Sequence, residues 1–233
     1  LVMEQVRSQK VKLLPIDSEH SAVFQCLTAG HSSEVDSIIL TASGGPFLEW
    51  DIDRIRDASP EDALNHPRWK MGDKISIDSA SMFNKGLEII EAHHLFGVSV
   101  ERIRVMIHPQ SIVHSMVEFC DGSLIAQLGT TDMRTPIQFA LSYPDRLPAT
   151  ADRLGLDSLA RLEFREPDPQ RFPCLRLARE AAALGGTMPA FVSVANEELV
   201  QAFLSEKIKF GAVPALMEKA LERHRVIDPY TLE

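Results

Sequence analysis

Short apolar runs alternate with helical patterns along the first two-thirds of the chain. The apolar runs predict buried strands at residues 12–16, 37–42 and 104–107. Helical spacing of apolar positions predicts helices at residues 21–27, 80–95 and 135–142. Residues 112–119 and 123–128 alternate between apolar and polar positions, and Cys120-Asp121-Gly122 between them favours a tight turn. The pattern predicts an α/β (α+β) domain with a mixed sheet that carries an antiparallel hairpin.

The last third of the chain has a different pattern. Residues 143–168 are rich in Pro, Asp and Arg, which is typical of a connector with little regular structure. Beyond them, helical spacing predicts a small helical bundle, with helices at 174–184, 190–204 and 213–224. We therefore expect three parts: an α/β domain (1–142), a connector (143–168) and a C-terminal helical domain (169–233). A helix tail at residues 1–8 leads straight into the first predicted strand, which suggests that the chain begins inside a longer polypeptide.

The composition restricts the partners and the compartment. The chain has 233 residues, 45% of them hydrophobic, and a net charge of −9, which argues against nucleic acid or an anionic membrane as a partner. No uncharged apolar stretch reaches the roughly 18 residues that a membrane helix needs. Cys26, Cys120 and Cys174 are widely spaced without a CxxC motif, which predicts reduced thiols and a cytoplasmic location. A catalytic or zinc-binding cysteine is the less favoured interpretation.

The most informative segment runs from His66 to Gly97, where a polar cluster leads into an amphipathic helix. Helical spacing gives that helix a polar stripe, formed by Ser81, Asn84, Lys85 and Glu88. The opposite, apolar stripe is formed by Phe83, Leu87 and Ile90. A helix that opens near Asp78 and Ser79 would offer backbone N–H groups to an anion, while Glu88 could hold a cation. The alternative is a polar face that is simply solvated.

Two acidic residues, Asp17 and Glu19, follow the strand predicted at residues 12–16. In extended backbone they would point to the same side, and two converging carboxylates need a cation or a proton between them. With Glu88 as a third oxygen ligand, the set suits a hard divalent ion such as Mg²⁺ or Mn²⁺. A solvated turn is the alternative.

Two loops carry further candidates. Ser43-Gly44-Gly45 follows the strand predicted at 37–42, and paired glycines let backbone N–H groups approach an anion; the alternative is a plain tight turn. The loop that begins at His66 could be a lid, in which Trp69 and Met71 exclude water while His66 hydrogen-bonds a ligand. Alternatively, Trp69 only anchors this loop to the core.

Three residues near the hairpin are ambiguous by themselves. His108 and His114 flank the start of its first strand, and strand histidines are more often structural than catalytic. Met133 would ordinarily fill a core.

Five segments of the chain occur together in a fixed order and spacing: PIDSEHSAVFQ, ILTASGGPF, HPRWKMGDKISIDSASMFNKGLE, IHPQSIVHSMVEF and DGSLIAQLGTTDMRTPI. They closely resemble the 1-deoxy-D-xylulose 5-phosphate reductoisomerase family. The resemblance is dense from Val11 to Pro144 and looser beyond, where Ala195-Asn196-Glu197 matches a family signature. Members convert 1-deoxy-D-xylulose 5-phosphate to 2-C-methyl-D-erythritol 4-phosphate in non-mevalonate isoprenoid synthesis, using NADPH and Mg²⁺ or Mn²⁺.

The resemblance also implies roles for individual residues. The metal ligands would be Asp17, Glu19 and Glu88, and the phosphate pocket would contain Ser43, Ser79, Asn84 and Lys85. Ser18 would contact the carbonyl or hydroxyl end of the substrate, and the flexible flap would carry His66, Trp69 and Met71. Candidate catalytic residues are His66, His114 and Lys85, and candidate cofactor contacts are Met71, Gly72 and Met133.

The sequence departs from the family in one important respect. The family carries a glycine-rich dinucleotide-binding domain ahead of the DSE segment, and this chain has no such domain. We expect the chain to be the catalytic and C-terminal part of a reductoisomerase, inactive by itself. Smaller departures fall at Leu48, His94 and Val194, none of which is a proposed ligand.

Two other functional classes stay open. One is a cofactor-independent, metal-dependent sugar-phosphate lyase or phosphohydrolase, and the other is a non-catalytic remnant. The resemblance further implies a homodimer that pairs or packs through residues 112–128. It implies a cytoplasmic protein of bacterial type, with a plastid as the alternative within the family.

Overall fold

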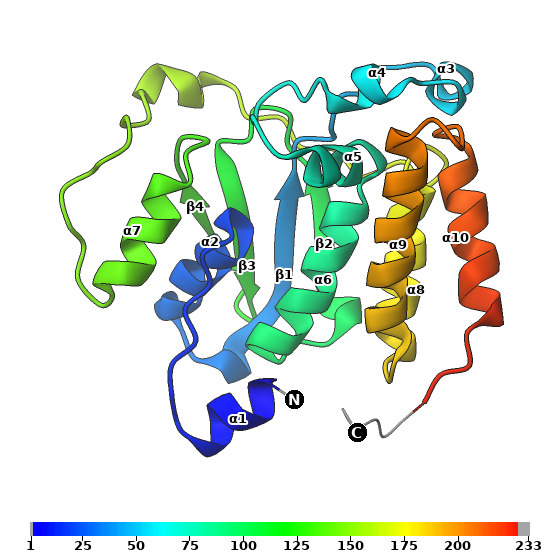
Figure 1. The fold of residues 1–233 in the computed structure, drawn as a ribbon. Coiled ribbons are helices and arrows are strands. Elements are labelled where there is room, and N and C mark those ends of the chain that lie inside the picture. Colours follow the sequence, from blue (N-terminus) through cyan, green and yellow to red (C-terminus); the bar gives the residue numbers. More distant parts are fainter. Residues whose placement is uncertain (1, 228–233) are drawn as a thin grey trace. The chain divides into compact units, whose positions relative to one another are not determined.

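The computed structural model describes residues 2–227, which form two compact units (Figure 1). In the described range, the first unit comprises residues 2–43 and 92–166, and the second comprises 44–91 and 167–227. This grouping differs from the expected division near residues 142 and 169. Residues 44–91 share one hydrophobic core with the C-terminal helices, so they belong with those helices and not with the sheet.

The first unit is built on a four-stranded sheet with the strand order β2-β1-β3-β4. Its strands are β1 (Val35–Ala42), β2 (Ile103–Ile107), β3 (Val113–Phe119) and β4 (Leu124–Leu128). Strand β1 pairs in parallel with β2 and antiparallel with β3, and β3 and β4 form the predicted hairpin. Gly122 in the hairpin turn has a φ of 84°, which suits glycine. The mixed α/β fold with its antiparallel hairpin is thereby confirmed.

Helices and short 3₁₀ turns accompany this sheet. The helices are α1 (Val2–Ser8), α2 (Ser18–Cys26) and α7 (Arg134–Ser142), and the 3₁₀ turns are Leu27–Ala29, Ser32–Glu34, Val100–Arg102 and Leu156–Ala160. Helix α2 packs against β3 and β4 through a buried apolar face that includes Ala22, Val23 and Cys26. The segment 143–168 is mostly irregular, as predicted, apart from its 3₁₀ turn and one bridge from Arg165 to Ile107.

The strand predicted at residues 12–16 is wrong, because this segment has no regular structure. Its apolar side chains do not enter a core: Leu13 is 41% exposed and Ile16 is 55% exposed. Pro15 also lacks the N–H group that a central strand would donate. Asp17 and Glu19 therefore follow an irregular segment, and α2 begins at once with Asp17 as its N-cap residue.

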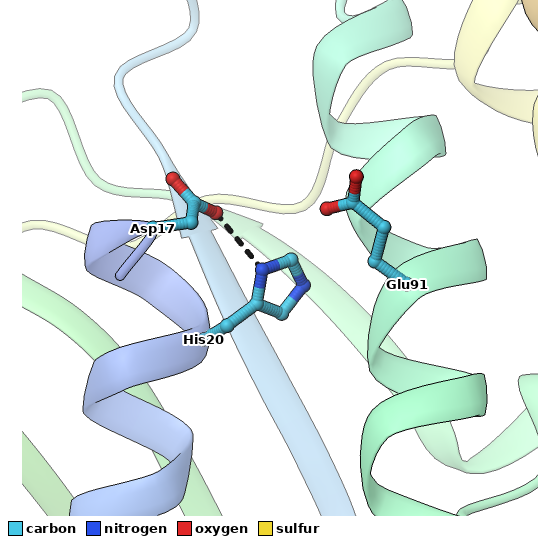
Figure 2. A group of neighbouring side chains, drawn as sticks. All are labelled: Asp17, His20 and Glu91. Atoms are coloured by element: carbon cyan, nitrogen blue, oxygen red, sulfur yellow. Dashed lines mark ion pairs between the residues drawn. The ribbon is translucent and has the colours of Figure 1, made fainter. Parts of the chain in front are cut away.

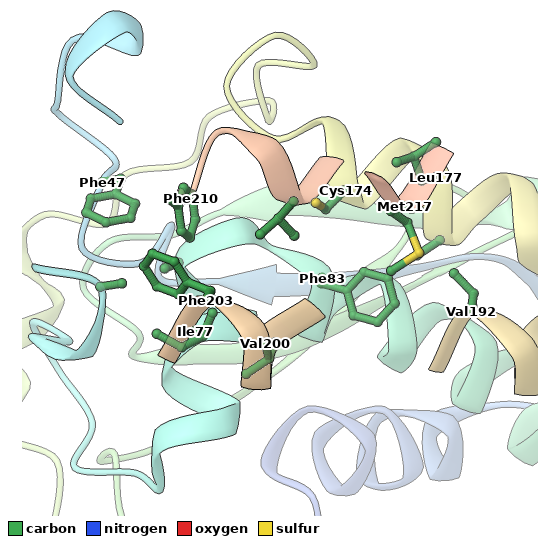
Figure 3. Close-up of a cluster of buried hydrophobic side chains, with 14 of the residues drawn as sticks. Phe47, Ile77, Phe83, Cys174, Leu177, Val192, Val200, Phe203, Phe210 and Met217 are labelled. Atoms are coloured by element: carbon green, nitrogen blue, oxygen red, sulfur yellow. The ribbon is translucent and has the colours of Figure 1, made fainter. Parts of the chain in front are cut away.

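The second unit is helical. Its helices are α3 (Ile52–Arg56), α4 (Pro60–Leu64), α5 (Asp73–Ser81), residues 83–91 of α6 (Phe83–Phe96), α8 (Pro173–Leu184), α9 (Met188–Leu204) and α10 (Ala212–Arg223). Helices α8, α9 and α10 agree with the three helices predicted for the bundle. Their apolar faces share a core with Phe47, Ile77 and Phe83, all at most 1% exposed (Figure 3). In the part of the chain that the structure describes, no helix combines the length and apolarity needed to cross a bilayer.

The single helix predicted at 80–95 is two helices, and this changes the expected polar stripe. Helix α5 ends at Ser81, Met82 adopts a left-handed conformation with φ of 57°, and α6 begins at Phe83. Met82 is 2% exposed, so burial of its side chain offsets the cost of a backbone conformation that non-glycine residues rarely adopt. Ser81 therefore lies on a different helix from Asn84. Asp78 and Ser79 occupy the last turn of α5, not the start of a helix as we had predicted.

Candidate active site

The first candidate cluster lies at the N-terminus of α2. Asp17 is the N-cap residue, and Ser18 and Glu19 open the first turn. One carboxylate oxygen of Asp17 and one of Glu19 lie within 4.8 Å of each other, and Ser18 Oγ donates to Glu19 Oε2 at 2.5 Å. The positive end of the helix dipole favours two negative charges at this position. A pair of hard oxygen donors at this spacing fits a shared divalent cation such as Mg²⁺.

A histidine that the sequence analysis did not single out supports Asp17. His20 Nδ1 lies 3.0 Å from Asp17 Oδ2 (Figure 2). His20 is 1% exposed, and its ring lies 6.3 Å from the ring of Phe96, with an angle of 42° between the two ring planes. Packing therefore fixes the imidazole, and the imidazole in turn restricts the rotamer of Asp17. The i, i+3 spacing of the two residues at a helix start was the signal available in the sequence. Glu91, also drawn in Figure 2, lies on α6 in the second unit.

The second cluster lies on the first turns of α6. Lys85 Nζ donates to Glu88 Oε2 at 2.6 Å, and Asn84 Nδ2 donates to Glu88 Oε1 at 2.7 Å. The side chains of Lys85 and Glu88 are only 4% and 5% exposed, so this ion pair is desolvated. The structure thus brings together three of the four residues of the predicted polar stripe. The alternative of a solvated polar face is wrong for Lys85 and Glu88.

The glycine turn after β1 packs against the last turn of α5. Gly44 and Gly45 have φ angles of 86° and 67°, and a methyl group added at Gly45 would lie 2.6 Å from the carbonyl oxygen of Ser79. Only glycine permits both this conformation and this close approach. Ser43 directly precedes the turn and is half-buried, as is Ser79. The tight turn and the phosphate loop, which the sequence left as alternatives, are both compatible with this geometry.

A buried polar pair ties the end of α5 to α9. Asn196 Nδ2 donates to Asp78 Oδ1 at 2.7 Å, and Lys74 Nζ donates to Asp78 Oδ2 at 2.6 Å. Asp78 and Asn196 are each 1% exposed. Burial raises the pKa of Asp78, and the hydrogen bonds from Asn196 and Lys74 partly offset that effect. The pairing could not be predicted from the sequence, because the two residues are far apart in the chain.

The segment 65–72 has no regular structure, as expected for a flap loop. His66 Nδ1 accepts hydrogen bonds from the backbone N–H groups of Trp69, at 2.9 Å, and Arg68, at 3.2 Å. Burial lowers the pKa of His66, so the ring is neutral near pH 7 with its proton on Nε2. Trp69 and Met71 are half-buried, and Gly72 is the N-cap residue of α5.

The remaining candidates lie in the first unit. His114 is in β3 and 8% exposed, and a methyl group at Gly129 would lie 3.3 Å from its Nε2 atom. Met133, half-buried, precedes α7 as its N-cap residue. His108 has a structural role: its Nδ1 lies 2.8 Å from the carbonyl oxygen of Glu163, and its Nε2 accepts from the N–H of Ile112.

Solved structures with this fold belong to a class of reductoisomerases that have been determined with NADPH and magnesium. The fold matches "1-deoxy-D-xylulose 5-phosphate reductoisomerase from zymomonas mobilis in complex with NADPH" with a TM-score of 0.92 and 45% identity, over 99% of this chain and 59% of that chain. It also matches DOX-P reductoisomerase in complex with NADPH, fosmidomycin and magnesium, with a TM-score of 0.87 and 45% identity, over 96% of this chain and 57% of that chain.

Sequence comparisons agree with the structural ones. Residues 13–96 match a family model described as the 1-deoxy-D-xylulose 5-phosphate reductoisomerase C-terminal domain, and residues 128–233 match one described as the DXP reductoisomerase C-terminal domain. The reductoisomerase of Pelotomaculum thermopropionicum is 53% identical over all 233 residues, and that of a Geobacter species is 53% identical over 232. The chain belongs to the 1-deoxy-D-xylulose 5-phosphate reductoisomerase family and spans 60% of the length of these two relatives.

Proposed function

We propose that this chain is the metal- and substrate-binding part of an enzyme that converts 1-deoxy-D-xylulose 5-phosphate to 2-C-methyl-D-erythritol 4-phosphate with NADPH. Two clusters of charged side chains support the proposal: an acidic cluster and a buried ion pair. Asp17 and Glu19 meet at the start of α2, and Lys85 is buried against Glu88 on α6. Family membership supplies the identity of the reaction.

In this proposal Asp17, Glu19 and Glu88 hold a divalent metal. All three are carboxylates, the donor type that Mg²⁺ and Mn²⁺ prefer, and a carboxylate oxygen has more than one lone pair, so it can accept a hydrogen bond and bind a metal together. When bound, the metal would stabilise negative charge on substrate oxygens. Ser18, which donates to Glu19, would also contact the carbonyl or hydroxyl end of the substrate.

The phosphate group of the substrate would be held by Ser43, Ser79, Asn84 and Lys85. Contacts there lie away from the reacting carbons, so their binding energy positions the substrate and does no bond chemistry itself. Lys85 supplies the positive charge, and its partner Glu88 fixes the direction of the ammonium group. This ion pair joins Lys85, a proposed phosphate contact, to Glu88, a proposed metal ligand, within one turn of α6.

The two histidines and the flap loop would act on the substrate directly. The neutral ring of His66 offers an N–H donor at Nε2 while its own loop occupies Nδ1. Trp69 would cover the substrate and exclude water when the flap closes. His114 would line the substrate on the side of the sheet, and we treat it with His66 and Lys85 as a candidate catalytic residue.

For NADPH, the residues of this chain fit only part of the cofactor. Met71, Gly72 and Met133 could contact the nicotinamide, but the chain contains no GxGxxG motif for the pyrophosphate. We therefore expect the 233-residue chain to bind metal and substrate and to lack reductase activity by itself. The expected loss of reductase activity comes from weak NADPH binding. Joining the chain to a nucleotide-binding domain should therefore restore activity.

A homodimer completes the proposal. Strand β4 is an edge strand, and Leu124, Ile125 and Leu128 on it are 53%, 37% and 36% exposed. An exposed apolar edge strand is a template for pairing with a second copy. Replacing Ile125 by Lys should shift the protein toward the monomer in sedimentation, and an unmodified protein that sediments as a monomer would count against the dimer.

The decisive experiment joins the chain to the nucleotide-binding domain of a relative and follows NADPH oxidation. The fused protein should oxidise NADPH only when 1-deoxy-D-xylulose 5-phosphate and Mg²⁺ or Mn²⁺ are both present. Glu88→Gln should abolish turnover, while Glu180→Gln, an exposed carboxylate on α8, should leave it unchanged. Full activity in Glu88→Gln would remove Glu88 from the metal site.

The alternative classes give different results with the 233-residue chain itself. Cleavage or phosphate release from the sugar phosphate without NADPH would favour the lyase or phosphohydrolase. Absence of Mn²⁺ binding in calorimetry would favour a non-catalytic remnant.

A further inference from the structure

The buried pair Asp78–Asn196 has no part in the proposed contacts with metal or substrate. Both side chains are 1% exposed, and the carboxylate of Asp78 accepts from Asn196 and from Lys74. Nearby positions on the same two helices are apolar and buried, since Ile77 and Ala80 on α5 and Val192 and Val200 on α9 all belong to the core of the second unit. An apolar pair of similar volume would pack there without the cost of desolvating a carboxylate. A buried polar pair in such a place is better explained by the geometry that it fixes than by stability.

The geometry in question is that of the junction between α5 and α6. Asp78 lies one residue before Ser79, and its carbonyl oxygen accepts from Ser81 Oγ at 3.2 Å. Ser81 Oγ also accepts from the N–H of Phe83 at 3.3 Å, which caps the start of α6. Met82, with its left-handed backbone conformation, is the single residue between α5 and α6. Asp78 therefore contacts α9 through its side chain, and its carbonyl oxygen is linked to the start of α6 through the hydroxyl group of Ser81.

The residues proposed to grip phosphate lie on either side of this junction. Ser79 is on the last turn of α5, against the glycine turn at Gly45, and Lys85 is on the first turns of α6. A hydrogen bond has a narrow range of lengths and angles, so it sets the register of two packed helices more sharply than apolar contacts do. A shift of α5 along α9 would move Ser79 relative to the glycine turn and tilt the start of α6.

We infer that Asp78 and Asn196 are positioning residues, which hold α5 in register with α9 and thereby place Ser79 and Lys85 for binding a phosphate group. This inference rests on the proposed function, because it assumes that Ser79 and Lys85 contact phosphate. Neither Asp78 nor Asn196 is among the proposed substrate contacts. Their effect reaches the site through the position of α5, which carries Ser79, and through the junction between α5 and α6.

The test uses reciprocal substitutions. Asn196→Asp removes the amide group that donates to Asp78 and places a second carboxylate against it, so α5 should lose its register with α9. Adding Asp78→Asn to that variant restores one donor and one acceptor: the new amide oxygen accepts from Lys74, and the new amide N–H donates to the new aspartate. The affinity of the folded protein for inorganic phosphate is measured by calorimetry, together with the midpoint of thermal unfolding.

We expect Asn196→Asp to weaken phosphate binding roughly tenfold, and the double variant to recover to within about twofold of the unmodified protein. A merely structural bond would lower the unfolding midpoint and leave the affinity of the folded protein unchanged, and that result would overturn the inference. If Asn196→Asp does not fold, the double variant decides: tight phosphate binding supports the positioning role, and weak binding in a folded double variant contradicts it. If the unmodified protein binds no phosphate, the proposed phosphate site fails and this inference fails with it.

Discussion

The buried ion pair between Lys85 and Glu88 gives the sharpest prediction about stability. Glu88→Gln keeps the volume of the side chain but removes its charge, so the buried ammonium of Lys85 loses the negative charge that lies 2.6 Å from it. The glutamine amide can accept from Lys85 or from Asn84 through its oxygen, and its NH₂ group then faces the other donor. Both side chains of the pair are at most 5% exposed, so solvent screening offers little relief. Removing one partner of such a pair costs about 3–5 kcal/mol, a large part of the stability of a typical domain.

Urea unfolding followed by tryptophan fluorescence would measure this loss. Both tryptophans, Trp50 and Trp69, belong to the second unit, so the signal reports on the unit that contains the ion pair. The matched control is Glu180→Gln, which removes an exposed carboxylate that pairs with Arg176 at 2.8 Å. Because that pair is half exposed, its loss should cost less than about 1 kcal/mol.

If Glu88→Gln lost no more stability than Glu180→Gln, the Lys85–Glu88 pair would be effectively solvated, contrary to this prediction. A second variant separates stability from function. Replacing Lys85 by Met together with Glu88 by Leu exchanges the ion pair for an apolar one, which should restore most of the stability. That double variant should nevertheless lose Mn²⁺ binding in calorimetry if Glu88 is a metal ligand.

Three further predictions concern the backbone, the pH dependence and the thiols. Gly45→Ala should destabilise the protein in urea unfolding by at least about 1 kcal/mol more than Gly97→Ala, because both glycines have φ near 67–68° but only Gly45 meets a backbone oxygen at 2.6 Å; equal losses would contradict this. Burial raises the pKa of Asp78 above 3.8, so its contribution to stability is present below pH 3.8 and is lost as the pH rises through the raised value. Asp78→Asn should flatten the dependence of unfolding free energy on pH above 3.8, and an unchanged slope would show that Asp78 does not cause it. A thiol reagent should label the exposed Cys120 rapidly and leave Cys174 unlabelled until unfolding, because burial raises the pKa of Cys174 to about 12; rapid labelling of Cys174, located by peptide mapping, would contradict its burial.

Local patterns in the sequence determined most of the regular structure. Strand β1, the hairpin β3–β4 and the helices α7 to α10 follow from apolar spacing and turn residues, which are properties of neighbouring positions. The grouping of Asn84, Lys85 and Glu88 also follows from helical spacing alone, because all three lie within one helix. Family membership was likewise available from the order and spacing of five motifs.

Other features were decided only by the tertiary structure. The apolar run at 12–16 resembles a strand, but a strand needs a neighbouring strand to pair with. The periodicity of the run does not reveal whether such a neighbour exists. The break at Met82 depends on burial of that side chain in a core built from distant segments. The pairing of Asp78 with Asn196 joins residues that are 118 positions apart.

The physical reason is common to these cases. Hydrophobic periodicity reports which face of an element is buried, but it carries no information about which element lies against that face. The sequence therefore determined the elements, the family and the chemistry of the candidate residues. Tertiary packing decided where helices end, which segments share a core, and which buried polar groups meet.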